Sequence, residues 1–218
     1  RHVISILKAG FGVTVMRVRP GAYGILNMYL SNPALANDET YVPGLSRKYI
    51  AETFGVPLDD VAKLGSAEKP FGPSPKALEA VTATLSRMDI YPNWTAEPLR
   101  EKIAKKYGYR SDEVICGAGE TEIISWIVRT FAGPGDGILM YEPCFPMYHL
   151  FADAENRRCV YVPMGDRFEF RIDDYISAID ETIRMVFLTN PHSPSGKLMD
   201  NGDIKRICKV AGDRLVVL

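Results

Sequence analysis

The sequence predicts an α/β fold, with a largely parallel sheet and helices on both faces, preceded by an N-terminal arm. From residue 114 onward, short apolar runs typical of buried strands alternate with segments whose apolar residues recur at helical spacing. Strand-helix alternation of this kind favours parallel strands with packed helices. The strand runs are residues 114–116, 137–141, 158–163, 185–188 and 214–218.

Composition places the chain among ordinary globular proteins. Its 218 residues fit one large domain or a domain and a half, with 46% hydrophobic and 24% charged residues. A formal net charge of −1 argues against general binding to nucleic acid or to anionic membranes. No apolar run reaches the roughly 18 residues that a membrane span requires. We expect a cytoplasmic protein with no nucleic-acid or membrane partner.

Cysteine and histidine usage predicts no metal site. The four cysteines, Cys116, Cys144, Cys159 and Cys208, show no ligand spacing and no C-x-x-C pair. We expect them to be reduced and mostly buried thiols. The three histidines are scattered along the chain.

Both ends of the chain look cut. The first residue is not Met, and residues 215–218 are an apolar run without a following turn. Residues 1–40 match no pattern, and we leave them unassigned and expect poor order. We expect an arm and a substrate-side loop in residues 41–75. Residues 76–218 then form the first part of a large ligand-binding domain.

The helices of this domain have recognisable ends. Pro75 opens one helix, because proline is tolerated at the first helical position. Apolar residues in this helix recur every three or four positions, which predicts a buried face; they are Ala77, Leu78, Val81, Leu85 and Met88. The next helix ends at Gly108.

A rigid polar turn follows the strand at residues 185–188. Residues 190–196 read Asn-Pro-His-Ser-Pro-Ser-Gly, and the two prolines and the glycine end regular structure. Ligands of parallel α/β sheets bind just beyond the C-terminal ends of strands. The alternative is an ordinary loop between a strand and a helix. We expect Asn190 to cap the turn with its side chain.

A glycine turn opens the helix that begins near residue 120. Residues 117–122 read Gly-Ala-Gly-Glu-Thr-Glu. Backbone N–H groups at a helix start, together with the helix dipole, favour a phosphate. A dinucleotide fingerprint is the rival interpretation, but Glu122 stands where that motif has its third glycine.

Together these motifs resemble those of fold-type I pyridoxal-phosphate aminotransferases of class I/II, most closely the histidinol-phosphate branch. The two turns above match, in the same order, as do residues 41–44 (Tyr-Val-Pro-Gly), 63–75 and 91–92 (Tyr-Pro). Residues 143–148 (Pro-Cys-Phe-Pro-Met-Tyr) match the family's Pro-Thr-(Phe/Tyr)-x-x-Tyr. The resemblance covers residues 41–218, little more than half of a full family member.

The resemblance implies a pyridoxal 5′-phosphate site. Residues at the positions that contact the cofactor in the family are Gly119, Glu120 and Thr121 at the phosphate, Phe145 stacked on the pyridine ring, Ser193 at the phenolate oxygen, and Tyr91 reaching the phosphate of a partner subunit. Tyr148 is a possible second wall or a core aromatic. Ala67 and Lys69 fall in the substrate loop. The Schiff-base lysine and the aspartate at the pyridine nitrogen are expected beyond Leu218, so we assign no catalytic residue and expect this fragment alone to be inactive.

Four of these positions depart from the family pattern. Ala67 and Lys69 replace asparagines, and Ser193 replaces the asparagine at the phenolate oxygen. Glu120 replaces a small residue. A charge 4 Å from a phosphate costs on the order of 4 kcal/mol at an effective dielectric of 20, while the helix dipole returns only about 0.3–1 kcal/mol. Glu120 is therefore expected to point away or to pair with a base.

The resulting hypothesis is the N-terminal half of an aminotransferase of amino-acid biosynthesis, with histidine biosynthesis as the candidate pathway. As a homodimer at full length, it would transfer an amino group between an amino acid, with histidinol phosphate as one candidate, and a 2-oxo acid. Alternatives are a threonine-phosphate-type decarboxylase and a non-catalytic relative that has lost its site. A nucleotide-binding oxidoreductase would rest on residues 117–119 alone.

Overall fold

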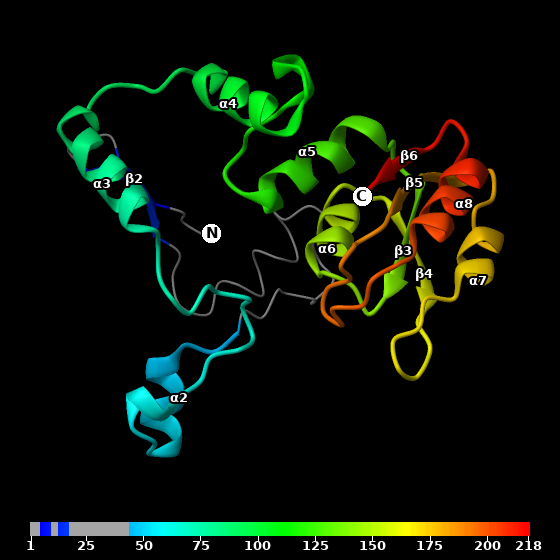
Figure 1. The fold of residues 1–218 in the computed structure, drawn as a ribbon, viewed down its shortest axis with the longest axis horizontal. Coiled ribbons are helices and arrows are strands. Elements are labelled where there is room, and N and C mark those ends of the chain that lie inside the picture. The colour runs from blue at the N-terminus through cyan, green and yellow to red at the C-terminus, as the bar shows by residue number, and fades with distance from the viewer. Residues whose placement is uncertain (1–4, 10–12, 18–43) are drawn as a thin grey trace. The chain divides into compact units, whose positions relative to one another are not determined.

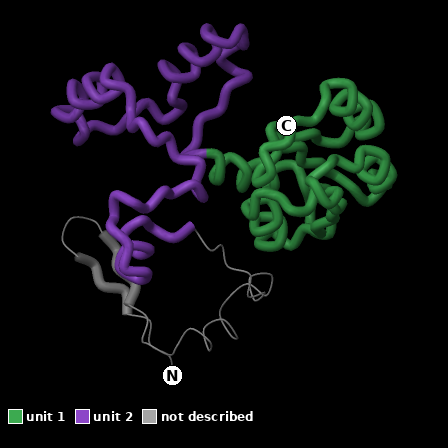
Figure 2. Tube along the Cα trace, turned by 60° about the horizontal axis from the view of Figure 1, so that its bottom comes forward, with its two compact units in different colours: residues 1–41, 120–218 green, residues 42–119 purple. Residues whose placement is uncertain are grey.

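The computed structural model describes residues 5–9, 13–17 and 44–218. The chain divides into two compact units, of which one is Val42–Gly119 and the other contains Glu120–Leu218 (Figure 2). Tyr41 of the predicted arm lies outside the described residues. Each unit is considered by itself.

The larger unit is built on a four-stranded parallel sheet with the strand order β4-β3-β5-β6 (Figure 1). The strands are β3 (Gly137–Glu142), β4 (Arg158–Pro163), β5 (Ile183–Phe187) and β6 (Leu215–Val217). Four helices accompany them: α5 (Glu120–Phe131), α6 (Met147–Ala154), α7 (Ile172–Ser177) and α8 (Asn201–Ala211). The α/β fold and its parallel sheet are confirmed.

The two central strands, β3 and β5, are buried on both faces. Successive side chains of a strand point to opposite faces. Ile138 and Met140 of β3 accordingly join a core cluster with residues of α5 and α6. Leu139 and Tyr141 join a second cluster with residues of α7 and α8. Each fully buried aliphatic side chain contributes about 1.5–3 kcal/mol, so the helices are held on both faces by the strands between them.

Tyr175 of α7 ties the sheet together from within the second cluster. Its side chain is fully buried, and its hydroxyl donates to the carbonyls of Leu139 at 3.1 Å and Phe187 at 2.9 Å. The ring stacks on Tyr141 with centroids 4.4 Å apart. Burial, reinforced by Tyr141, raises the pKa of Tyr175, so the hydroxyl keeps the proton that it donates.

The smaller unit consists of helices with almost no interior. It contains α2 (Arg47–Phe54), α3 (Pro75–Thr84) and α4 (Glu97–Tyr107), each with a short 3₁₀ helix nearby: η2 (Leu58–Asp60), η3 (Leu85–Arg87) and η4 (Ser111–Glu113). The predicted ends are confirmed, because α3 begins at Pro75 and α4 stops at Gly108, which adopts φ 77°.

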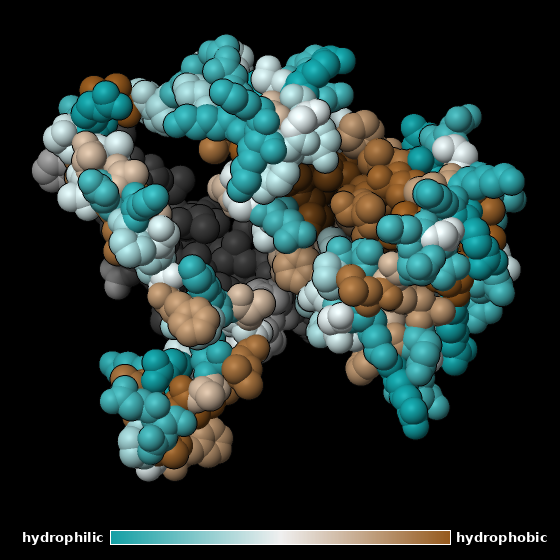
Figure 3. All heavy atoms as spheres, in the orientation of Figure 1, coloured by the Kyte–Doolittle hydropathy of each residue, from teal (hydrophilic) through white to brown (hydrophobic). Residues whose placement is uncertain are grey.

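The predicted buried face of α3 is wrong for the described part of the chain. Leu78, Val81 and Leu85 are each more than half exposed, and Met88 is 76% exposed. The periodicity is real, but no element of residues 44–119 covers this face. Around α2, too, apolar side chains lie at the surface (Figure 3).

Two other local predictions differ from the structure. Residues 114–116 follow η4 as extended backbone and form no ladder with another described strand, so the predicted strand is absent. Within residues 1–40, where no element was predicted, β1 (Ser5–Ala9) and β2 (Val13–Arg17) pair antiparallel.

The four cysteines are free, as expected, but none is fully buried. Cys116, Cys144 and Cys159 are partly buried, and Cys208 on α8 is exposed. Burial, with a smaller contribution from Glu142, raises the pKa of Cys144 to about 11. Burial also raises the pKa of Cys159 to about 12, with Asp153 adding to the effect.

Replacing Tyr175 with Phe removes the hydroxyl that links β3 and β5 but keeps the packed ring. We expect the free energy of unfolding to fall by about 1 kcal/mol, the net value of a typical hydrogen bond. Urea denaturation followed by circular dichroism measures this change. Tyr109→Phe is the control, because Tyr109 is 61% exposed. Equal urea-denaturation midpoints for Tyr175→Phe and the unmodified protein would show that this hydroxyl does not stabilise the sheet.

Candidate functional site

The candidate site lies at the edge of the sheet where the parallel strands end. Residues 143–146 follow β3, and residues 188–199 follow β5. The peptide bonds before Pro143, Pro191 and Pro194, all in these two segments, are cis. Both segments carry polar and aromatic groups at the C-terminal ends of two neighbouring, largely buried strands.

The helix α5 begins with open backbone. Gly119, the residue before it, adopts φ 83°, and a Cβ placed there would meet no atom within 4 Å. The N–H of Gly119 donates to the carbonyl of Gly117 at 2.8 Å. The first N–H groups of any α-helix lack intrahelical partners. Exposed Thr121 adds a hydroxyl, so this helix start can receive an anion.

Glu120 carries a negative charge at this helix start. It is exposed and makes no ion pair with a described residue. Burial raises the pKa of the Tyr148 phenol, and the Glu120 carboxylate adds to this rise. Glu120 thus acts on the aromatic cluster that follows β3 and has no base beside it, so the expected pairing is not found among the described residues.

Phe145 presents a partly buried ring in the segment after β3. It stands edge-on to Tyr148, with centroids 5.7 Å apart and an interplanar angle of 85°. Tyr148 is only 6% exposed; it stacks on Phe187 and its hydroxyl lies 2.9 Å from that of Thr189. Tyr148 is therefore a core aromatic that packs against Phe145. Of the two rings, only Phe145 is partly exposed.

The turn at residues 190–196 is fixed by hydrogen bonds within the chain. The Asn190 side chain accepts from the N–H of Met199 at 2.9 Å and donates to its carbonyl at 3.4 Å. This confirms the predicted capping role of Asn190. The N–H of Gly196, at φ 71°, donates to the His192 carbonyl at 2.6 Å. Exposed Ser193 has no hydrogen bond to another described residue, so its hydroxyl is available to a ligand.

His192 is a residue of this turn that the sequence did not single out. It is 3% exposed, and its Nδ1 lies 2.7 Å from the Ser195 hydroxyl oxygen. Burial lowers the pKa of His192. Nothing in a lone histidine between prolines marks it as buried, since the covering ring comes from Phe170, in the segment after β4.

The remaining predicted site residues belong to the smaller unit. Tyr91 is 98% exposed, and Ala67 and Lys69 are exposed, with Ala67 at φ 49°. Thr121, Phe145 and Ser193 belong to the larger unit. The roles of Tyr91, Ala67 and Lys69 stay predictions.

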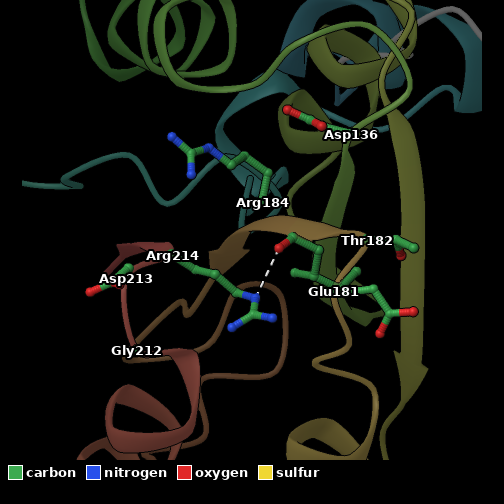
Figure 4. Close-up of a pocket in the computed structure, with 8 residues that line it drawn as sticks. Asp136, Glu181, Thr182, Arg184, Gly212, Asp213 and Arg214 are labelled. Atoms are coloured by element: carbon green, nitrogen blue, oxygen red, sulfur yellow. Dashed lines mark hydrogen bonds between the residues drawn. The ribbon is translucent and has the colours of Figure 1, made fainter.

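An open cavity of about 470 Å³ lies at the opposite edge of the sheet (Figure 4). It is lined by residues that precede β3, β5 and β6, among them Asp136, Thr182 and Asp213. Arg214 at its wall donates from Nε to the carbonyl of Ile183 at 2.9 Å. This cavity contains none of the predicted site residues.

Two negative findings apply to the described residues. No three His, Cys, Asp or Glu side chains among them are grouped so that they could hold a metal ion. No helix in this part of the chain is long and apolar enough to cross a membrane.

Known structures share the fold of this chain. Histidinol-phosphate aminotransferase from Sinorhizobium meliloti, solved in complex with pyridoxal 5′-phosphate, superposes with a TM-score of 0.74 at 19% identity over 86% of this chain and 50% of its own. N-succinyldiaminopimelate aminotransferase from Mycobacterium tuberculosis gives a TM-score of 0.69 at 22% identity, over 88% of this chain and 50% of its own. At these identities the likeness establishes the fold.

Sequence comparison establishes the family. The chain is 40% identical over 183 residues to histidinol-phosphate aminotransferase of Methanothermobacter thermautotrophicus, which covers 83% of this chain and 48% of that protein. It thus spans about half the length of the curated relatives that it matches. The profile of class I and II aminotransferases matches residues 59–218. The chain belongs to the class I and II aminotransferase family.

Proposed function

We propose that the whole protein is a pyridoxal-phosphate-dependent aminotransferase, with histidinol phosphate as its amino-group partner. This chain would supply the phosphate cradle and one ring-covering face of the cofactor site. The observation that carries the proposal is the open backbone at Gly119 and the start of α5, in a chain whose residues 59–218 match the family. The names of relatives 32–40% identical, all histidinol-phosphate aminotransferases, support the substrate.

The residues present fit the cofactor. Because Gly119 has no side chain and no atom lies within 4 Å of its Cβ position, a phosphate can approach the backbone at the start of α5. The ring of Phe145 is apolar, flat and partly exposed, which suits one face of a pyridine ring. The hydroxyl of Ser193 is free to meet a phenolate oxygen, although a serine is shorter than the family's asparagine.

When bound, pyridoxal phosphate supplies an electron sink for chemistry at an amino acid's α-carbon. The chain's own residues have simpler tasks. The N–H groups at the start of α5 and the Thr121 hydroxyl would bind the phosphate. Phe145 would cover one face of the ring and keep water from it, while Ser193 would orient the ring edge. We assign no covalent attachment residue within the described part of the chain.

We also propose that the protein works as a homodimer. Within residues 44–119, Ala104 is the one buried residue, while Leu64, Phe71, Tyr91 and Trp94 are 88–98% exposed. Apolar surface of this extent is typical of an interaction surface. Sedimentation or light scattering of the full-length protein tests the assembly.

The activity test is product analysis with the full-length protein, pyridoxal phosphate, histidinol phosphate and 2-oxoglutarate. We expect glutamate to form in an amount equal to the 2-oxoglutarate consumed. Release of CO₂ from threonine phosphate instead would favour the decarboxylase alternative. Bound cofactor with neither product would favour a non-catalytic relative.

Replacing Phe145 with Ala is expected to weaken pyridoxal-phosphate binding about tenfold, because one face of the ring loses its aromatic cover. Cofactor absorbance during equilibrium dialysis measures the change. Phe131→Ala is the matched control: Phe131 is 48% exposed at the far end of α5, where its carbonyl accepts from Arg184. Equal affinities for the two variants would place the cofactor elsewhere.

Replacing Glu120 with Gln removes the charge at the phosphate cradle and keeps the shape of the side chain. We expect inorganic phosphate to bind roughly tenfold more tightly, with the gain shrinking as salt screens the repulsion. Isothermal titration calorimetry at two ionic strengths measures this. Glu181→Gln, at the opposite edge of the sheet, is the control. An unchanged phosphate affinity would show that Glu120 points away from the cradle.

A further inference from the structure

His192 lies where three segments of the larger unit meet. Its ring is edge-on to Phe170, from the segment after β4, with centroids 5.7 Å apart and an angle of 90°. Phe170 in turn stands edge-on to Tyr141 of β3, with centroids 5.2 Å apart, so the ring is linked to the strand that precedes Phe145. The carbonyl of Pro143, after β3, opposes the fall in the pKa of His192 that burial causes. Ser195, in its own turn after β5, holds Nδ1 at 2.7 Å. One buried side chain thus joins its own turn after β5 to the segment after β4 and, through Phe170, to β3.

The hydrogen bonds around Ser195 indicate which ring nitrogen carries the proton. The Ser195 hydroxyl oxygen accepts from the N–H of Lys197 at 3.3 Å. Nε2 of His192 is buried and makes no hydrogen bond within the described residues. Because the Ser195 oxygen already accepts from Lys197, its own proton is available to Nδ1, and the ring proton then lies on Nε2. Ser195 then donates to Nδ1 of a neutral imidazole.

The backbone of the turn closes around the same ring. The His192 N–H donates to the Lys197 carbonyl at 2.7 Å, and the His192 carbonyl accepts from Gly196 at 2.6 Å. The turn is therefore closed by its own backbone hydrogen bonds, and His192 is its buried residue. Ser193 is the next residue along the chain, and Phe145 lies two residues beyond Pro143. The packing of His192 on Phe170, and of Phe170 on Tyr141 of β3, therefore bears on the separation of Phe145 and Ser193.

We propose that His192 is a positioning residue of the cofactor site: bound to Ser195 and packed on Phe170, which itself packs on Tyr141 of β3, it holds the turn that carries Ser193 at a set distance from the segment that carries Phe145. This inference rests on the proposed function, because both residues are assigned to the cofactor ring. The phosphate cradle at the start of α5 takes no part in these contacts of His192. Losing the contacts is therefore expected to weaken binding of the cofactor ring and to leave phosphate binding unchanged.

The test compares two ligands on the full-length protein. His192→Phe keeps the ring volume and the contact with Phe170 but breaks the bond to Ser195; Ser195→Ala breaks the same bond from the other side. We expect each variant to bind pyridoxal phosphate about tenfold more weakly and inorganic phosphate with unchanged affinity. Because both substitutions remove the same hydrogen bond, the double variant is expected to bind pyridoxal phosphate with the same affinity as each single variant.

Tyr175→Phe is the control for a merely structural effect. It also removes a buried hydroxyl bond, but in the core beneath the sheet. It is expected to lower stability while leaving both affinities unchanged. In addition, ¹⁵N shifts of the His192 ring report the proton on Nε2, and Ser195→Ala is expected to move the Nδ1 resonance. If His192→Phe does not fold, Ser195→Ala and the ring shifts still decide the matter.

The outcomes separate the two proposals. No binding of pyridoxal phosphate by the unmodified protein would overturn the proposed function and this inference with it. Binding by the unmodified protein with equal affinity in Ser195→Ala would overturn the positioning role alone. A parallel loss of affinity for both ligands would assign His192 to general stability and would also contradict the positioning role.

Discussion

The burial of β3 and β5 on both faces is the constraint on which the larger unit depends. Ile138, Leu139 and Met140 have at most 1% of their surface exposed, and they alternate between two separate clusters. Because neither face is free, every helix must pack against the sheet and every connection must cross at a strand end. The segments after β3 and β5 are thereby brought side by side, and these segments carry the candidate site.

Much of this unit is predictable from the sequence because its signals are local. Apolar runs such as residues 185–188 become buried strands, and the turn that ends in Gly196 is placed by its own prolines and glycine. The capping role of Asn190 follows from the same local chemistry. What the sequence cannot supply is the environment of a side chain whose neighbours come from distant segments. His192 looks like an exposed turn residue until Phe170, from another loop, is seen to cover it.

In the smaller unit, the sequence predicts burial that the structure does not show. The apolar spacing of α3 predicts a buried face, yet Leu78, Val81 and Leu85 are exposed in the described chain. Periodicity reports that a face is suited to burial; it does not report what covers that face. The same reasoning explains the missing strand at residues 114–116, since extended backbone becomes a strand only when a ladder partner lies beside it.

One feature of the site bears on its chemical selectivity. Cys144 is the immediate neighbour of Phe145, and burial raises the pKa of its thiol to about 11. A sulfur that keeps its proton is a poor nucleophile, because the thiolate is the reactive form. Burial of Cys144 therefore keeps the thiol beside Phe145 in its protonated, less reactive form.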